Sequence, residues 1–306
     1  MTMSKTSITS GQEKQYERFV EDAARRGAAL GLKKVPMTKR DLQRLFEHGG
    51  EFQTAIAEII VSKTHELSVG YQFADEEVSS NHTYPEDYKP KGITEQIACL
   101  HELFPELGSA YEKLAKQPLP HAAEGWFAIP RWEKVASTYG EAVEKALNLI
   151  AKTRNGKLKL YKFREGGLGS RYLKQHERTV AMLKRLGETQ SGYDILVIPT
   201  QFGLRHRGRS VRRAYKVFDV NEFGLGAFAV SIMLLMHPER LLYSYHLAIT
   251  CAGDRYEVFP DIDKDEQFNY VPHFSISCKN DEVIADLCLD YSARQDSGSA
   301  TGFLPQ

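Results

Sequence analysis

The sequence predicts an α+β protein, with a helical N-terminal part followed by a mixed α/β domain that contains a small, partly antiparallel sheet. Up to about residue 118, apolar residues recur at the spacing of one helix face. From Trp126 onward, short apolar and alternating segments typical of strands lie between helices. We therefore expect a disordered start at residues 1–9, a helical domain at 10–118 and a mixed domain at 119–306.

The helices of the first part are predicted from their ends. Ser10 with Glu13 forms a capping box before a helix that ends near Leu30. Thr38 can cap a second helix, which ends before Gly49 and Gly50. Further helices are expected at 52–67, 94–104 and 107–116.

The mixed part combines helices with strands. Thr138 and Glu141 form another capping box, for a helix that ends near Arg154, and "KLKLYKF" at 157–163 alternates as a half-buried strand does. Further helices are expected at 171–186 and 225–236. The strands are expected at 126–130, 193–199, 245–251 and in a hairpin at 273–289 that turns at "KND". Because 193–199 could also begin a parallel αβ unit, an α/β arrangement stays open.

Composition indicates an ordinary soluble globular protein of 306 residues, with 42% hydrophobic and 26% charged residues. The four cysteines, Cys99, Cys251, Cys278 and Cys288, form no CxxC pair, so we interpret them as reduced thiols. The longest apolar run, 226–236, is about half of what a membrane-spanning helix needs. The N-terminus lacks a secretory signal, so we expect a cytoplasmic protein without a membrane partner. No cofactor motif is evident, and the oligomeric state is not indicated.

Charge is distributed in blocks although the formal net charge is zero. Residues 152–216 carry 17 lysines and arginines against 4 acids, a net charge of +13. The flanking blocks, 1–151 and 217–306, carry −4 and −9. A clustered field of one sign attracts the opposite sign, so the basic block (152–216) predicts an anionic partner, inside the protein or outside it.

The densest part of this block is "GLRHRGRSVRRAYKVF" at 203–218. If Arg209 to Phe218 is helical, cations three and four residues apart share one face, and apolar residues share another. The expected cationic residues are Arg205, Arg207, Arg209, Arg212, Arg213 and Lys216. The expected buried residues are Val211, Ala214, Tyr215 and Phe218.

Three partners could neutralise these cations. A phosphate backbone predicts a non-catalytic nucleic-acid-binding or assembly protein. An acidic protein partner is a second possibility. The third is internal pairing with the acidic C-terminal third, in particular with the acids between 254 and 266.

The alternative from another class is a divalent-metal-dependent phosphoryl-transfer enzyme, similar in chemistry to a nuclease. Asp254, Asp261 and Asp263 could hold the metal ion, although the EF-hand reading fails because Glu266 and Pro272 occupy positions that need glycine and glutamate. Cys251, His246 and Asp254 are close in sequence and are weak catalytic candidates. A buried core thiol is the plainer interpretation of Cys251.

Overall fold

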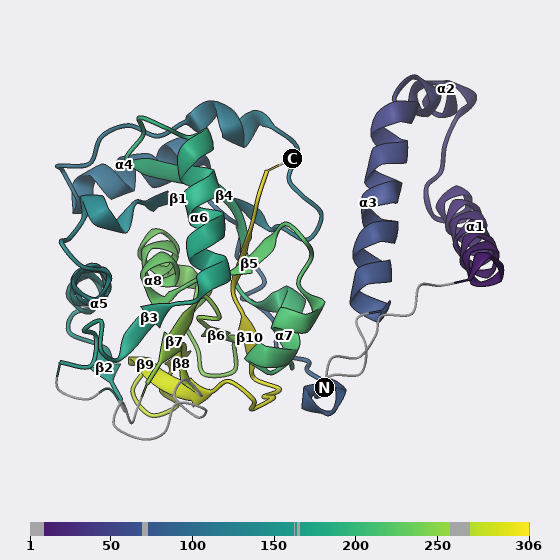
Figure 1. Ribbon diagram of the computed structural model, residues 1–306. Coiled ribbons are helices and arrows are strands. Elements are labelled where there is room, and N and C mark those ends of the chain that lie inside the picture. Colours follow the sequence, from purple (N-terminus) through teal and green to yellow (C-terminus); the bar gives the residue numbers. More distant parts are fainter. Residues whose placement is uncertain (1–8, 69–72, 162, 164–165, 258–269, 306) are drawn as a thin grey trace. The chain divides into compact units, whose positions relative to one another are not determined.

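The computed structural model (Figure 1) describes residues 9–68, 73–161, 163, 166–257 and 270–305. The chain forms two compact units, Met1–Thr64 and His65–Gln306. The predicted boundary near residue 118 falls inside the second unit. The predicted α+β class is confirmed, with helices first and strands later in the chain.

The first unit is helical. It contains α1 (Ser10–Lys34), α2 (Lys39–Glu47) and most of α3 (Gly49–Ser68). The predicted cap of α2 is confirmed, because Thr38 Oγ1 accepts a hydrogen bond from Asp41 N. The cap of α1 is Thr9 and not Ser10: the capping box is made with the side chain of Gln12, one residue earlier than predicted.

These helices expose much of their apolar surface. Among the described residues of the first unit, Ser62 is the only one that is buried. Large side chains such as Phe19, Leu32 and Phe46 are about two-thirds exposed. The first unit therefore has no hydrophobic core of its own within its described residues.

The second unit contains two sheets. The smaller one has four antiparallel strands in the order β1 (Gly125–Pro130), β4 (Ile195–Gln201), β11 (Thr301–Phe303) and β5 (Glu222–Gly224). Strands β1 and β4 are buried along their whole length, and apart from Thr200 and Gln201 at the end of β4 their residues are apolar or glycine. The predicted strand near 193–199 is thus antiparallel to its neighbours, and the parallel αβ alternative does not apply to it.

The larger sheet has seven strands. Its main path is β10 (Ser297–Ser299), β6 (Ala248–Thr250), β8 (Tyr270–Ile276), β7 (Asp254–Tyr256) and β3 (Leu173–Gln175), while β9 (Val283–Leu289) pairs with β8 and with β2 (Leu158–Leu160). The predicted hairpin is confirmed as β8 and β9. The strands expected at 193–199, 245–251 and 273–289 belong to two sheets and not to one.

Five α-helices lie in the described part of the second unit beyond α3: α4 (Ile93–Leu103), α5 (Tyr139–Thr153), α6 (Glu177–Thr189), α7 (Val211–Val217) and α8 (Ala227–Met236). Short 3-10 helices are η1 (Ala74–Glu76), η2 (Glu112–Lys116), η3 (Trp132–Lys134), η4 (Leu204–His206) and η5 (Pro238–Arg240). Every residue of α8 is buried, as the apolar run predicts, and it packs against α5, α4 and β1. This helix is the centre of the main hydrophobic core.

The start of α6 differs from the prediction. A helix was expected from Arg171, but residues 173–175 form β3, which pairs with β7. The helix begins at Glu177, where the His176 side chain accepts a hydrogen bond from Arg178 N at 3.1 Å. Residues 173–175 form a strand because they pair with a strand about 80 residues away in the sequence, and the helix therefore begins later.

None of the four cysteines, all of which lie in the described residues, forms a disulfide. Among the helices that the structure describes, none combines the length and apolar character that crossing a bilayer requires.

Candidate functional site

The basic segment around 205–216 forms η4 and α7. Ser210 caps α7 by accepting a hydrogen bond from Arg213 N at 3.1 Å. The predicted helix is confirmed in a shorter form, and Val211, Ala214 and Phe218 are buried as expected. Tyr215 is partly buried and stacks on His176 with ring centroids 4.2 Å apart.

The first part of this segment is paired with carboxylates that follow it in the chain. Arg205 lies 2.9 Å from Asp219 and 3.2 Å from Glu222, and His206 Nε2 lies 2.7 Å from the second oxygen of Glu222. Thr301 donates a further hydrogen bond to Glu222. Burial raises the pKa of the Glu222 carboxyl, but His206, Arg205 and the Thr301 hydroxyl together lower it to about 2. Glu222 is therefore a buried anion with its hydrogen bonds satisfied.

The second part is paired with two acids from an earlier loop. Both oxygens of Glu76 accept hydrogen bonds from Arg212, at 2.7 and 2.8 Å from Nε. Glu77 lies 3.3 Å from Arg209 and also forms an ion pair with Arg213. The Arg213 and Arg209 side chains are only 12% and 17% exposed, whereas that of Arg212 is 41% exposed.

Four arginines of the segment thus face four carboxylates. The acids are Glu76, Glu77, Asp219 and Glu222, none of which lies between 254 and 266. Two cations have no carboxylate partner within the described residues. Arg207 is exposed and donates to His82 O, and Lys216 Nζ lies 5.9 Å from the centre of the Phe73 ring. Nucleic-acid binding by this segment stays a prediction.

The structure describes the three weak catalytic candidates and one of the three metal candidates, Asp254. Cys251 is fully buried, and burial raises the pKa of its thiol well above the ordinary value, which keeps it protonated. Among the described residues no side-chain hydrogen bond joins Cys251, His246 and Asp254, although Asp254 N donates to the backbone oxygen of Cys251 at 3.1 Å. Asp261 and Asp263 lie outside the described residues, and no group of three or more metal-binding side chains is found in the rest.

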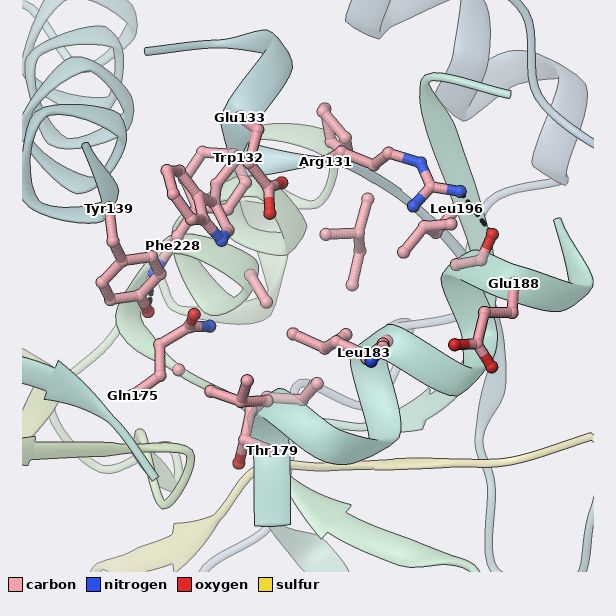
Figure 2. A pocket seen from close by; sticks show the side chains of 18 of the residues that line it. Arg131, Trp132, Glu133, Tyr139, Gln175, Thr179, Leu183, Glu188, Leu196 and Phe228 are labelled. Carbon is pink, nitrogen blue, oxygen red and sulfur yellow. Dashed lines mark hydrogen bonds between the residues drawn. The ribbon is translucent and has the colours of Figure 1, made fainter. Parts of the chain in front are cut away.

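A pocket of about 530 Å³ lies elsewhere in the second unit (Figure 2). Its walls come from both sheets and from α5, α6 and α8. The apolar wall consists of Ile129, Leu183, Leu196, Leu225, Phe228 and Ala229. This size and lining are typical of sites for small organic molecules.

Local sequence places the aromatic end of this pocket. Thr138 and Glu141 form the predicted capping box, with Glu141 N donating to Thr138 Oγ1, so Tyr139 becomes the first residue of α5. Trp132, at the start of η3, packs edge to face on Tyr139 with centroids 6.0 Å apart. The two rings form one end of the pocket (Figure 2).

Polar side chains lie at this same end. Figure 2 shows the Glu133 carboxylate and the Gln175 amide on either side of the space next to Trp132. Within the described residues, the side chains of Trp132, Glu133 and Gln175 make no hydrogen bond. Trp132 therefore offers a hydrogen-bond donor, Glu133 offers an acceptor, and the Gln175 amide can act as either.

Arg131, at the opposite end, has a structural role. Its guanidinium donates to Tyr193 O, Gly187 O and Gln190 O at 2.8 to 2.9 Å, and so closes the C-terminus of α6. A Cβ on Gly187 would lie 2.4 Å from Arg131 Nη1, so glycine permits this approach. Arg131 fixes the position of α6, which carries the other pocket wall.

Comparison with protein-family models, with curated proteins and with solved structures finds no match to this chain. Its function is therefore argued from the geometry alone.

Asp254 lies directly behind the pocket. It is 1% exposed and accepts hydrogen bonds from the Tyr139 hydroxyl at 2.8 and 2.9 Å and from Ala227 N at 2.7 Å. Burial raises the pKa of its carboxyl to about 7, against the opposing effect of these hydrogen bonds. Tyr139, which lines the pocket, thus connects its interior to a buried acid that titrates near neutral pH.

The sequence could have indicated part of this pocket. The capping box of Thr138 and Glu141, which orients Tyr139, is visible in the sequence. Gln175 gave no signal, because its position depends on the pairing of β3 with β7.

Proposed function

We propose that this protein binds a small, planar, uncharged organic molecule in the pocket formed by η3, α5, α6 and α8. The observation that supports the proposal is the cluster of Trp132, Glu133 and Gln175 at one end of the cavity, because within the described residues their side chains make no hydrogen bond. An apolar body would contact Leu183 and Phe228. A polar edge with both a donor and an acceptor would reach the three polar groups.

The chemistry of the polar end favours a heteroaromatic ligand. The Trp132 indole offers a flat face as well as an N–H donor, and aromatic faces stack on planar rings. Glu133 accepts hydrogen bonds only, while Gln175 can both donate and accept. An amino or amide edge on a flat ring satisfies this combination.

A first test uses N-phenyl-1-naphthylamine, an uncharged aromatic amine that becomes fluorescent in apolar sites. We expect saturable binding to the wild-type chain. Val180→Phe should weaken it at least about tenfold, because Val180 lines the pocket and is 48% exposed, so a larger side chain there obstructs the cavity without entering the core.

The matched control is Val220→Phe. Val220 is 74% exposed and does not line the pocket, so the same substitution there should leave binding unchanged. Equal affinity of both variants for the probe would place its binding elsewhere and would count against the proposal.

A further inference from the structure

A second cavity, of about 660 Å³, lies between the loop 81–88 and residues 239–246. It shares no lining residue with the pocket of Figure 2. Its two sides are tied together: His82 Nδ1 lies 2.9 Å from Tyr245 O, and Leu247 N donates to Thr83 O at 3.0 Å. The cavity is therefore held by contacts between segments about 160 residues apart.

An aromatic platform forms one side. Tyr243 and Tyr245 are stacked with centroids 5.3 Å apart and planes 7° from parallel, and the His246 ring packs edge-on against both. The two tyrosines are nevertheless 47% and 64% exposed. Flat, exposed aromatic faces of this kind attract cations through their negative π surface.

The charged side chains that line this cavity are all acidic. Glu86, Asp87 and Glu239 contribute carboxylates, and no lysine or arginine is among the lining residues. Three arginines lie next to its walls, and one of them, Arg207, donates to His82 O at 3.2 Å. Arg154 is close enough to Glu239 to interact with it, and the buried Arg240 is accompanied by Glu124. The lining therefore favours a cation.

Two buried polar atoms on this lining have no hydrogen-bond partner: His246 Nδ1 and the Tyr88 hydroxyl oxygen. The His246 residue is only 7% exposed. Burial, and then the charge of Arg240, lower the pKa of its imidazole, so the ring is neutral at neutral pH and can accept a hydrogen bond. Leaving such atoms unpaired is unfavourable, and a ligand rich in donors would satisfy them.

We propose that this cavity binds a guanidinium group. A guanidinium is planar, carries five N–H donors and no acceptor, and stacks on aromatic faces. It matches the tyrosine pair by its plane, the carboxylates by its charge and His246 by its donors. The protein already places one guanidinium in this way, since Arg240 lies 3.7 Å from the centre of the Tyr84 ring behind the same cavity. The site is separate from that of the proposed function.

The test is calorimetric titration of the full chain with N-acetyl-arginine methyl ester and with N-acetyl-citrulline methyl ester, which has nearly the same shape without the charge. We expect saturable binding of the arginine compound and at least about tenfold weaker binding of the citrulline compound. Equal binding of the two, or binding of neither, overturns the proposal.

Variants locate the binding. Tyr245→Leu and Glu239→Gln should each weaken binding of the arginine compound about threefold to tenfold, whereas Tyr161→Leu, at a partly exposed tyrosine outside this cavity, should not. Unchanged affinity in both cavity variants would refute the assignment. Agmatine and the peptide acetyl-Ala-Arg-Ala-amide are titrated in parallel. Tighter binding of agmatine indicates a free guanidine as the ligand, and tighter binding of the peptide indicates an arginine side chain.

Discussion

The ion pairs of the basic segment predict a measurable coupling between Arg213 and Glu77. Arg213 is 12% exposed and Glu77 31% exposed, so the pair is intermediate between a surface ion pair and a buried one. Surface pairs contribute about 0.2–1 kcal/mol, and removing one partner of a buried pair costs about 3–5 kcal/mol. We therefore expect Arg213→Ala to lower the free energy of unfolding by about 1–2 kcal/mol.

Glu77→Gln should lower the free energy of unfolding more than Arg213→Ala does. Glu77 also pairs with Arg209 at 3.3 Å, so its replacement removes the carboxylate partner of two guanidinium groups. In the double variant Arg213→Ala with Glu77→Gln, the loss of unfolding free energy should be smaller than the sum of the two single losses. We expect a coupling energy of about 1 kcal/mol from a double-mutant cycle measured by denaturant unfolding.

Arg207→Ala is the control. Its side chain is exposed and has no carboxylate partner among the described residues, so the free energy of unfolding should change by no more than about 0.5 kcal/mol. Two results would refute the reasoning that the arginines are held by internal carboxylates. One is that the losses of unfolding free energy in Arg213→Ala and Glu77→Gln add up in the double variant. The other is that Arg207→Ala loses as much unfolding free energy as Arg213→Ala.

Three further predictions concern other parts of the chain. Asp254 has a folded-state pKa of about 7, above its ordinary 3.8, so the folded state binds this proton more tightly than the unfolded state does. The free energy of unfolding of the wild type should therefore fall, relative to that of Asp254→Asn, as pH rises from 5 to 8. Parallel pH profiles of the two unfolding free energies would contradict this. Backbone amides of α1 and α2 should exchange with deuterium much faster than those of the fully buried α8, and equally slow exchange would mean that their apolar surface is covered. If the basic segment binds nucleic acid, Arg207→Ala with Lys216→Ala should weaken oligonucleotide binding and reduce its salt slope by about 2, whereas no binding at low salt removes that prediction.

Features that depend on nearby residues were predictable from the sequence. The caps of α2 and α5 follow from Thr38 and Thr138, and the burial of α8 follows from its continuous apolar run. The hairpin of β8 and β9 follows from two alternating segments around a short turn, where Asp281 adopts a left-handed backbone conformation. In each case the deciding contacts lie within a few residues.

Features that depend on distant pairing were not predictable. Residues 171–176 have helical composition, but the ladder between β3 and β7 decides their conformation. The acids that pair with Arg212 and Arg213 lie about 136 residues earlier, in a stretch that reads as a surface loop. The pocket likewise needs Trp132, Gln175 and Phe228 to be brought together, and no local pattern encodes that.

The binding pocket is the central claim, and the two tryptophans of the chain allow it to be tested directly. With 5-fluorotryptophan incorporated, Trp132 reports the pocket, while Trp126 packs in a separate cluster with Leu114 and Val197 and does not line the pocket. Trp126→Phe assigns the two fluorine resonances. On titration with N-phenyl-1-naphthylamine, we predict that the Trp132 resonance shifts to saturation while that of Trp126 stays in place. Saturable binding that leaves the Trp132 resonance unmoved would contradict the account.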